Sequence, residues 1–380
     1  MEKEYALWLC NLPGIGNVRG RKLLELCGGS AKKLYDAPDR IWKQVISDQV
    51  YEKVKTYTEG WRLSEEYEKL QEKNIGLAAL SDRTYPEKLR NIPDAPFVLF
   101  YKGKLEENCK LSVAVVGARD CSEYGSYVAE GLGRALGKQG IPLISGMARG
   151  IDGISQQAAL DQGGSSYGVL GCGVDICYPA GNRKLYDRLV RQGAVLSPYP
   201  PGTEPRAGNF PPRNRIVSGM ADAVVVVEAR NRSGTLITVD MALEQGRDVY
   251  VAPGRVTDRL SDGCNRLLKQ GAQVFLSPED FLEDLFAVHP EAAERTKRAA
   301  VTEEKGKTSV PSPSENLSLE LKQVYEALDF TPRSIGQIND RLPFPCAIGS
   351  LSSMLMVLCM KKLAVQVSPG YFCILGKATF

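Results

Sequence analysis

A chain of 380 residues, 43% of them hydrophobic and 24% charged, is long enough for two or three domains with at least one large core. No segment approaches the roughly 20 apolar residues of a membrane helix, and the N-terminus does not have the pattern of a signal peptide, so we expect a cytoplasmic protein. Ten cysteines without a Cys-x-x-Cys pair indicate reduced thiols, and a single histidine, His289, argues against histidine-based catalysis and the usual zinc sites. The net charge of +3 is too small to establish a polyanionic partner by itself.

Residues 1–75 predict a domain of short helices. Two apolar-periodic stretches are separated by Leu12-Pro13-Gly14-Ile15-Gly16, which resembles a helix-hairpin-helix motif of a SAM-like domain. In that motif the glycines expose N–H groups near a helix N-terminus, where they suit a phosphate. A tight turn between packed helices explains the same residues, so DNA contact and simple packing both remain possible.

Residues 76–286 predict a doubly wound α/β domain. From Gly76 to Lys104 a short extended stretch and several prolines indicate a connector packed on the strands and helices after it. After Leu111, apolar strands alternate with amphipathic helices, from SVAVVGAR to DVYVAPG. Repeated βα units force right-handed crossovers, which predicts a doubly wound parallel sheet with helices on both faces and 224–227 as a central strand.

Two further segments complete the chain. Residues 287–316 are polar, charged and proline-bearing, which is typical of a linker. Residues 317–380 predict three helices followed by a two-stranded hairpin, the pattern of a winged helix. Its third helix, GSLSSMLMVLCM, carries serines and apolar groups instead of basic side chains, which favours protein contact or packing over reading of a DNA groove.

The candidate ligand site lies where the parallel strands end. In an open α/β sheet the ligand crevice lies beyond the carboxyl ends of the strands, where the strand order reverses. Glycines there let a ligand approach main-chain N–H groups, and Ser or Thr adds hydroxyl donors. Several arginines beside these turns favour an anionic ligand, although surface salt bridges could account for some of them. Phe210, between basic residues in a loop, could stack a base or pack in the core. The candidate residues are Gly117, Arg119, Ser145, Gly146, Arg149, Gly150, Arg206, Phe210, Arg213, Asn214, Arg215, Ser233, Gly234 and Thr235.

Two enzymatic alternatives use the same crevice. The turn GARDCSEYG lacks the Gly-x-Gly-x-x-Gly pattern of a dinucleotide site, so we expect no nicotinamide cofactor, and no other cofactor or metal is expected. Ser233-Gly234-Thr235 faintly resembles the nucleotide-cleaving lysine decarboxylase-like phosphoribohydrolases, but Thr238 stands where their glutamate belongs. Glu228, Asp175 or Glu244 could substitute as an acid or base. A module that senses a small nucleotide is a further alternative.

Seven distinctive segments follow one another between about residues 80 and 275: YPEKLRNIPDAPFVLFYKG, VAVVGAR, SGMARGIDGISQQAAL, YPAGNRKLY, NFPPRNRIVSGM, SGTLIT and GCNRLLKQGA. In these segments and in their order the chain resembles the DprA family of DNA-processing proteins. The resemblance implies an extended Rossmann-like fold that binds single-stranded DNA, forms a homodimer through this domain, and loads the RecA recombinase in natural transformation and recombination. The leading hypothesis is a non-enzymatic protein that binds single strands without sequence preference. No membrane contact is expected.

The resemblance also assigns residues. It implies phosphate contacts for Arg119, Arg149 and the Arg213-Asn214-Arg215 run, and a base contact for Phe210. Two positions depart from the family pattern: Ala118 stands where Ser is frequent, and Met147 where Gly is frequent. A hydroxyl contact is therefore missing at the first position, and a close backbone approach is in question at the second.

Overall fold

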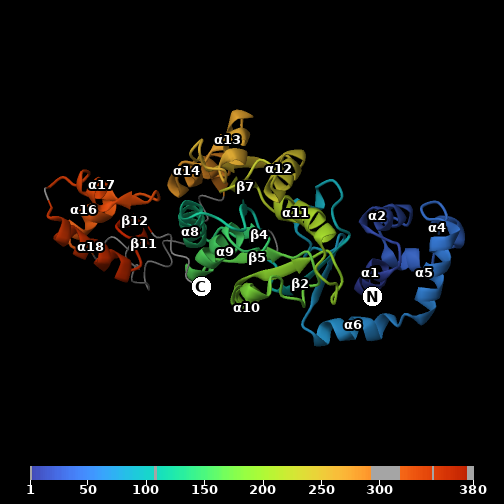
Figure 1. Cartoon of the computed structure of the whole chain (residues 1–380). Helices are drawn as coiled ribbons and strands as arrows, with labels where there is room; N and C mark the ends of the chain where they lie inside the picture. Colours follow the sequence, from blue (N-terminus) through green and yellow to red (C-terminus); the bar gives the residue numbers. More distant parts are fainter. Residues whose placement is uncertain (1, 107–108, 292–316, 345, 375–380) are drawn as a thin grey trace.

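The computed structural model describes residues 2–106, 109–291, 317–344 and 346–374. Helices at the N-terminal end lie on one side of a central α/β part, and a small C-terminal part lies on the other side (Figure 1). Most of the expected linker, 287–316, falls outside the described residues. No helix within the described ranges has the length and apolar character needed to cross a membrane.

Short helices form the N-terminal part, as expected from the sequence. Their bounds are α1 Glu2–Asn11, α2 Asn17–Leu26, α3 Ala31–Tyr35, α4 Asp39–Trp42, α5 Asp48–Gly60 and α6 Leu63–Glu72. Trp8 is buried at the centre, with its ring edge-on to Tyr35 and Trp42 at centroid distances of 4.9 and 5.9 Å. The hairpin between α1 and α2 packs on the central part, because the Asn17 amide donates to the carbonyl of Asp94 at 2.8 Å and accepts the Phe97 N–H at 3.1 Å.

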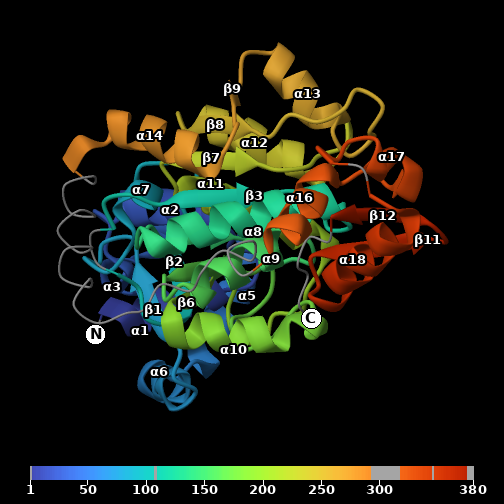
Figure 2. The same cartoon turned by 90° about the vertical axis from the view of Figure 1, so that its left-hand side faces the viewer.

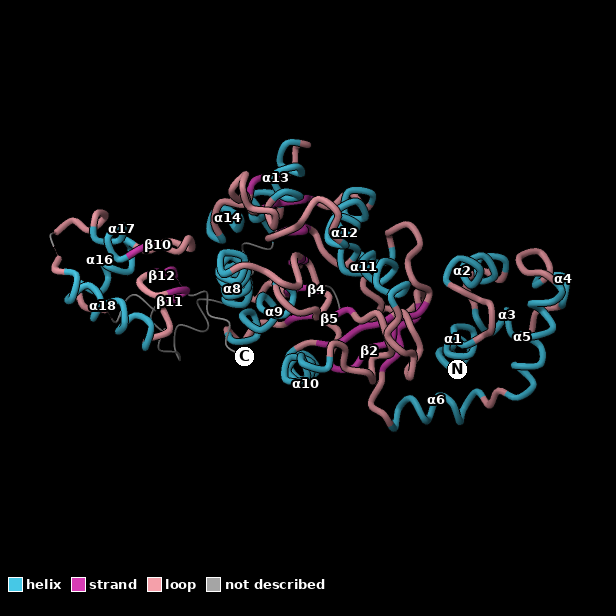
Figure 3. The backbone as a smooth tube through the Cα atoms, viewed as in Figure 1, coloured by secondary structure: helices cyan, strands magenta, loops and turns pink. Residues whose placement is uncertain are grey.

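A large, mostly parallel sheet forms the central part (Figure 3). Its order is β1-β2-β6-β5-β4-β3-β7-β8-β9. The bounds are β1 Gly76–Ala79, β2 Val98–Gly103, β3 Val113–Val116, β4 Leu143–Ser145, β5 Ser166–Val169, β6 Ala194–Ser197, β7 Ala223–Val226, β8 Asp248–Val251 and β9 Gln273–Val274. Strand β7 is fully buried between β3 and β8, so the expected central strand is confirmed.

The segment 76–104 does more than connect two domains. It contributes β1 and β2, which pair antiparallel with each other and, through β2, with β6. The sheet is therefore mixed, not purely parallel as the βα pattern predicted. Segments 77–79 and 98–100 are almost wholly buried, which explains why they join a sheet edge instead of lying on its surface.

Helices cover both faces because each strand alternates its side chains. Val113 and Val115 of β3 pack in one core with residues of α8 and α14, while Ala114 and Val116 pack in a second core with residues of α11 and α12. Figure 2 views the sheet from the side of α8 and α9. The helices are α7 Glu87–Arg90, α8 Glu123–Lys138, α9 Ile151–Asp161, α10 Arg183–Gln192, α11 Phe210–Gly219, α12 Gly234–Glu244, α13 Asp262–Lys269 and α14 Pro278–Val288.

The strand order reverses between β3 and β7. From β3 the chain moves outward through β4, β5 and β6, then returns to place β7 on the other side of β3. A crevice for a ligand is expected at this point, outside the carboxyl ends of the two strands.

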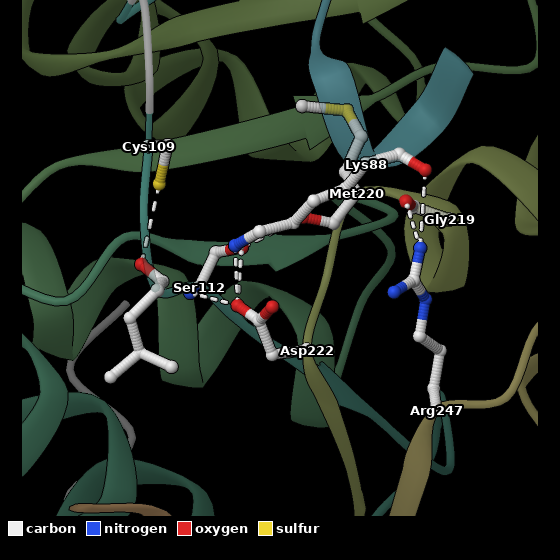
Figure 4. Close-up of polar contacts among 8 residues, drawn as sticks. Lys88, Cys109, Ser112, Gly219, Met220, Asp222 and Arg247 are labelled. Atoms are coloured by element: carbon white, nitrogen blue, oxygen red, sulfur yellow. Dashed lines mark hydrogen bonds and ion pairs between the residues drawn. The ribbon is translucent and has the colours of Figure 1, made fainter. Parts of the chain in front are cut away.

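A polar network lies at the opposite ends of these strands, where β3 and β7 begin (Figure 4). The Asp222 carboxylate, just before β7, receives the Ser112 N–H at 2.8 Å and forms an ion pair with Lys88 of α7. Arg247 donates to the carbonyls of Lys88 and Gly219, both at 3.1 Å. These contacts tie the segment 76–104 to the starts of β3 and β7.

The C-terminal part contains helices and a small antiparallel sheet of order β10-β12-β11. Its elements are α16 Leu319–Ala327, β10 Arg333–Ser334, α17 Ile335–Asn339, α18 Ile348–Met360, β11 Ala364–Ser368 and β12 Tyr371–Ile374. The short strand β10 pairs with β12, so the expected two-stranded hairpin is extended by a third strand.

Candidate nucleic-acid interface

The loops after β3, β4 and β7 and the start of α11 enclose a pocket at the reversal of strand order. We call this 730 Å³ cavity the rim pocket. A smaller adjoining cavity of 90 Å³ extends toward the loop after β5. Ten of the fourteen candidate residues line the two cavities, namely Gly117, Arg119, Gly146, Arg149, Phe210, Arg213, Asn214, Ser233, Gly234 and Thr235. Side chains that the sequence placed far apart thus converge on one concave surface.

Exposed arginines give this surface its positive charge. Arg119 and Arg230 line the rim pocket as exposed side chains and form no ion pair within the described part of the chain. Arg149 lies 3.7 Å from Asp120, but both side chains are largely exposed, at 67% and 85%. A pair so exposed contributes little and is readily exchanged, so Arg149 remains available to an anion. Arg230 was not among the residues singled out from the sequence.

Arg213 differs from these arginines because it is buried. Its guanidinium donates to the carbonyl of Gly146 at 2.6 Å and to the carbonyl of Val169, and thereby joins the loops that follow β4 and β5. Burial raises the pKa of the Asp152 carboxyl nearby, while the positive charge of Arg213 opposes that shift. Arg213 therefore shapes the wall of the pocket and adds positive charge behind it. Because its guanidinium already donates to two carbonyls, fewer of its N–H groups are available to a ligand.

Two aromatic rings stand beside these charges. The rings of Phe210 and Tyr178 have centroids 5.6 Å apart, and Tyr178 is 43% exposed. The guanidinium carbons of Arg119 and Arg213 lie 5.7 and 5.8 Å from the Phe210 centroid, within the range of cation–π attraction. Gly171 admits the Phe210 ring, since a Cβ there would meet the ring at 2.8 Å. The sequence did not single out Tyr178, which lies in the YPAGNRKLY segment used only for the resemblance.

The N-terminus of α12 also opens into the rim pocket. Its first turn contains no acidic residue, and the N-cap Ser233 makes no side-chain capping bond; its hydroxyl oxygen is buried without a partner. The Thr235 hydroxyl donates to the carbonyl of Gly117 at 3.3 Å and so links this helix to the end of β3. First-turn N–H groups and the helix dipole suit an anion here.

The other candidates take different positions. The Ser145 hydroxyl is buried and donates to the carbonyl of Val115 at 2.6 Å, so it holds adjacent strands together. Gly150 adopts a φ of 69°, and a Cβ there would lie 2.3 Å from the carbonyl oxygen of Ala118, so glycine permits two loops to cross. Arg206 is exposed between pocket-lining residues. Arg215 lines a second cavity and pairs with Glu244 at 3.2 Å.

The backbone at Met147 takes the conformation that a glycine would. Its φ is 54°, its side chain is fully buried, and its carbonyl accepts the Asn182 amide at 3.0 Å. The loop after β4 therefore has a left-handed backbone conformation at this position, although the residue is methionine. Packing of the methionine side chain in the core offsets the strain of that conformation.

The carboxylates considered for acid–base chemistry are engaged away from the rim pocket. Glu228 accepts the N–H of Ser122 at 2.9 Å and the hydroxyl of the same residue, and burial raises the pKa of Glu228. Asp175 accepts the Gly202 N–H at 2.8 Å, and Glu244 pairs with Arg215. None of the three lines the rim pocket.

The expected capping of α8 by Ser122 is confirmed, since its hydroxyl accepts the Gly125 N–H at 3.1 Å.

Comparison with known proteins identifies the family. The family model described as DNA recombination-mediator protein A matches residues 76–286. This chain belongs to that family. The chain is also 42% identical to the DNA processing protein DprA of Streptococcus pneumoniae over 222 residues, covering 58% of this chain and 77% of that protein. The resemblance noted from the sequence is confirmed.

Solved structures of the family share the fold. The structure of DNA processing protein A from S. pneumoniae matches with a TM-score of 0.63 at 34% identity and covers 74% of this chain and 97% of that one. The structure of DNA processing protein A from Helicobacter pylori, which describes a single-stranded DNA binding mode of that protein, matches with a TM-score of 0.51 at 29% identity, covering 56% and 96% of the two chains. These relatives are named for DNA processing and for the binding of single-stranded DNA.

Proposed function

We propose that this protein binds single-stranded DNA without sequence preference in the rim pocket. One observation carries the proposal: exposed Arg119 and Arg149, the Phe210–Tyr178 pair and the N-terminus of α12 border the same connected cavities. Cations and main-chain donors bind the phosphates of DNA whatever its sequence, and an aromatic ring can stack on any base.

The chemistry of the pocket supports DNA over a nucleotide substrate. Acid–base catalysis requires a carboxylate in reach of the substrate, and the three candidates are engaged elsewhere. Two other carboxylates line the rim pocket, but Asp120 pairs with Arg149, and the buried Asp152 accepts the Gly146 N–H at 3.0 Å. The exposed arginines are spread over several loops, which suits a chain of phosphates better than a single one.

The wider role rests on family membership. We propose that the protein protects incoming or processed single strands and loads RecA onto them during DNA uptake and recombination. The same proposal includes a homodimer formed through the central part. It also includes a winged helix at residues 317–380 that contacts protein, and a helix-hairpin-helix at 12–16. The H. pylori relative supports the DNA ligand, since its structure concerns single-stranded DNA.

A competition experiment tests the ligand class. Labelled oligo-dT should bind the parent protein, and duplex of equal length and nucleoside monophosphates should compete poorly. Phe210→Ala should weaken oligo-dT binding by about 5- to 150-fold, because loss of one stacked base costs about 1 to 3 kcal/mol. Efficient displacement of oligo-dT by a monophosphate would favour a nucleotide sensor, and release of free base from it would favour an enzyme.

A further inference from the structure

A second cavity adjoins the rim pocket and lies between the N-terminal hairpin and the central part. This groove has a volume of 580 Å³, within the range of about 300 to 1,000 Å³ for ligand pockets. The hairpin residues Ile15–Val18 form one wall, and the start of α11 together with Tyr199 forms the other. We call it the hairpin groove.

We infer that a single strand bound in the rim pocket continues into the hairpin groove. This inference rests on the proposed function and extends it, because it makes the N-terminal helices part of the binding surface. Pro211 lines both cavities, so the two cavities are direct neighbours. Phe210 faces the first cavity and Arg215 the second, five positions later on the same helix, which is about 7.5 Å along its axis.

The lining of the groove suits nucleobases. Its walls are mainly apolar and include Phe97, Tyr199 and Met241 besides several prolines. The Tyr199 hydroxyl donates to the carbonyl of Asn209 at 3.2 Å, which holds the ring beside the start of α11. Bases lose little on leaving water for such walls, and an aromatic side chain stacks any of them.

The charges indicate which wall the phosphates follow. Arg215 lies on the α11 side, and its partner Glu244 is 59% exposed, so a phosphate can replace that carboxylate. Asp94 of the segment 76–104 also lines the groove, next to Asn17 of the hairpin, and its carboxylate would repel a phosphate there. The backbone is therefore expected along α11, with bases directed toward the apolar floor. An uncharged peptide would not use this asymmetry.

The test fills the groove and varies the length of the DNA. Val18 is 55% exposed and lines the groove, so Val18→Trp should obstruct it; Leu26, 44% exposed at the other end of α2 and absent from the lining, gives the matched control Leu26→Trp. Oligo-dT of about 4 to about 16 nucleotides covers the usual range of single-strand sites. Affinity for the longest oligomers should fall about tenfold in Val18→Trp and stay unchanged in Leu26→Trp, while the shortest oligomers bind all three proteins equally.

A cross-linking readout is independent of the substitution. Oligo-dT carrying a photoreactive uracil should cross-link to Tyr199 of the parent protein only when the oligomer exceeds the length that fills the rim pocket. Equal affinity of Val18→Trp and the parent for every length, or absence of any Tyr199 adduct, would overturn the inference. Failure of the proposed function looks different, because then the shortest oligomers would not bind the parent at all.

Discussion

At the scale of single residues, Gly171 shows how a missing side chain shapes the site. A Cβ added to Gly171 would lie only 2.8 and 3.0 Å from two carbons of the Phe210 ring. Gly171→Ala must therefore displace the ring and separate it from Tyr178 and Arg119. We expect affinity for oligo-dT to fall about tenfold with little loss of thermal stability. The control is Gly181→Ala, which has nothing within 4 Å of the added carbon and should bind as the parent does. Binding of Gly171→Ala equal to the control would remove Phe210 from the site.

Glu228 gives a prediction about pH. Burial raises its pKa above the ordinary 4.5, although hydrogen bonds from Ser122 oppose the shift. Between the two values the folded state holds more protons than the unfolded state, so this carboxyl makes the protein less stable as pH rises through that window. Glu228→Gln cannot ionise, and its stability relative to the parent should improve as pH rises from about 4.5 and then level off. Urea unfolding at a series of pH values measures this difference, and parallel curves for the two proteins would contradict it.

The arginines show what sequence can and cannot predict about a site. Arg119 ends the segment VAVVGAR, and Arg213 and Arg215 lie in NFPPRNRIVSGM; the sequence assigned all three to one phosphate-binding rim. In the structure one is exposed, one is buried against carbonyls, and one lines a different cavity. Their residue type follows from the motif, but their burial depends on how β4, β5 and α11 meet, which no local pattern specifies.

At the scale of elements, the Lys88–Asp222 pair joins the antiparallel strands to the parallel sheet. The side chains are only 19% and 11% exposed, and Ser112 shares both partners. Lys88→Met should leave a largely buried carboxylate without its cation and lower the free energy of unfolding by about 2 to 4 kcal/mol. Chemical denaturation measures the loss. Lys43→Met, which breaks the exposed pair with Asp48, is the matched control and should change stability little. Equal effects in both variants would show that the network does not fix the segment 76–104.

The elements themselves were largely predictable where periodicity was strong. Buried runs such as Val113–Val116 and Ala223–Val226 follow an unambiguous pattern, and the helices between them end at glycines or capping residues. The strands β1 and β2 were interpreted as a connector because they are short and flanked by prolines. Their role depends on pairing with β6, about a hundred residues later in the chain, and local sequence carries no signal for that contact.

At the scale of the whole molecule, one hydrophobic contact holds the C-terminal part against the start of α8. The Phe330 ring lies 5.0 Å from Tyr127 and 5.8 Å from Tyr124 between centroids, and Asp329 pairs with Arg255 at 3.4 Å. Burial alone would raise the pKa of Asp329, but Arg333 and Arg255 lower it below its ordinary range.

Phe330→Ala should release this contact. Aromatic pairs contribute about 0.5 to 1.5 kcal/mol each, so the ratio of docked to undocked molecules should fall several-fold. The radius of gyration measured by X-ray scattering should then increase. Val367→Ala, at a 55% exposed position on β11, should leave the radius unchanged. An unchanged radius in Phe330→Ala as well would mean that other contacts hold the C-terminal part in place.

The salt dependence of oligo-dT binding tests the central claim most directly. Arg119→Ala should lower affinity for oligomers of any sequence and reduce the slope of log affinity against log salt by about 0.7, the value for one phosphate contact on a single strand. Arg191→Ala removes an exposed arginine near the end of α10, outside the rim pocket, and should leave both quantities unchanged. If Arg119→Ala retains the affinity and slope of the parent at every salt concentration, the rim pocket does not hold the DNA backbone.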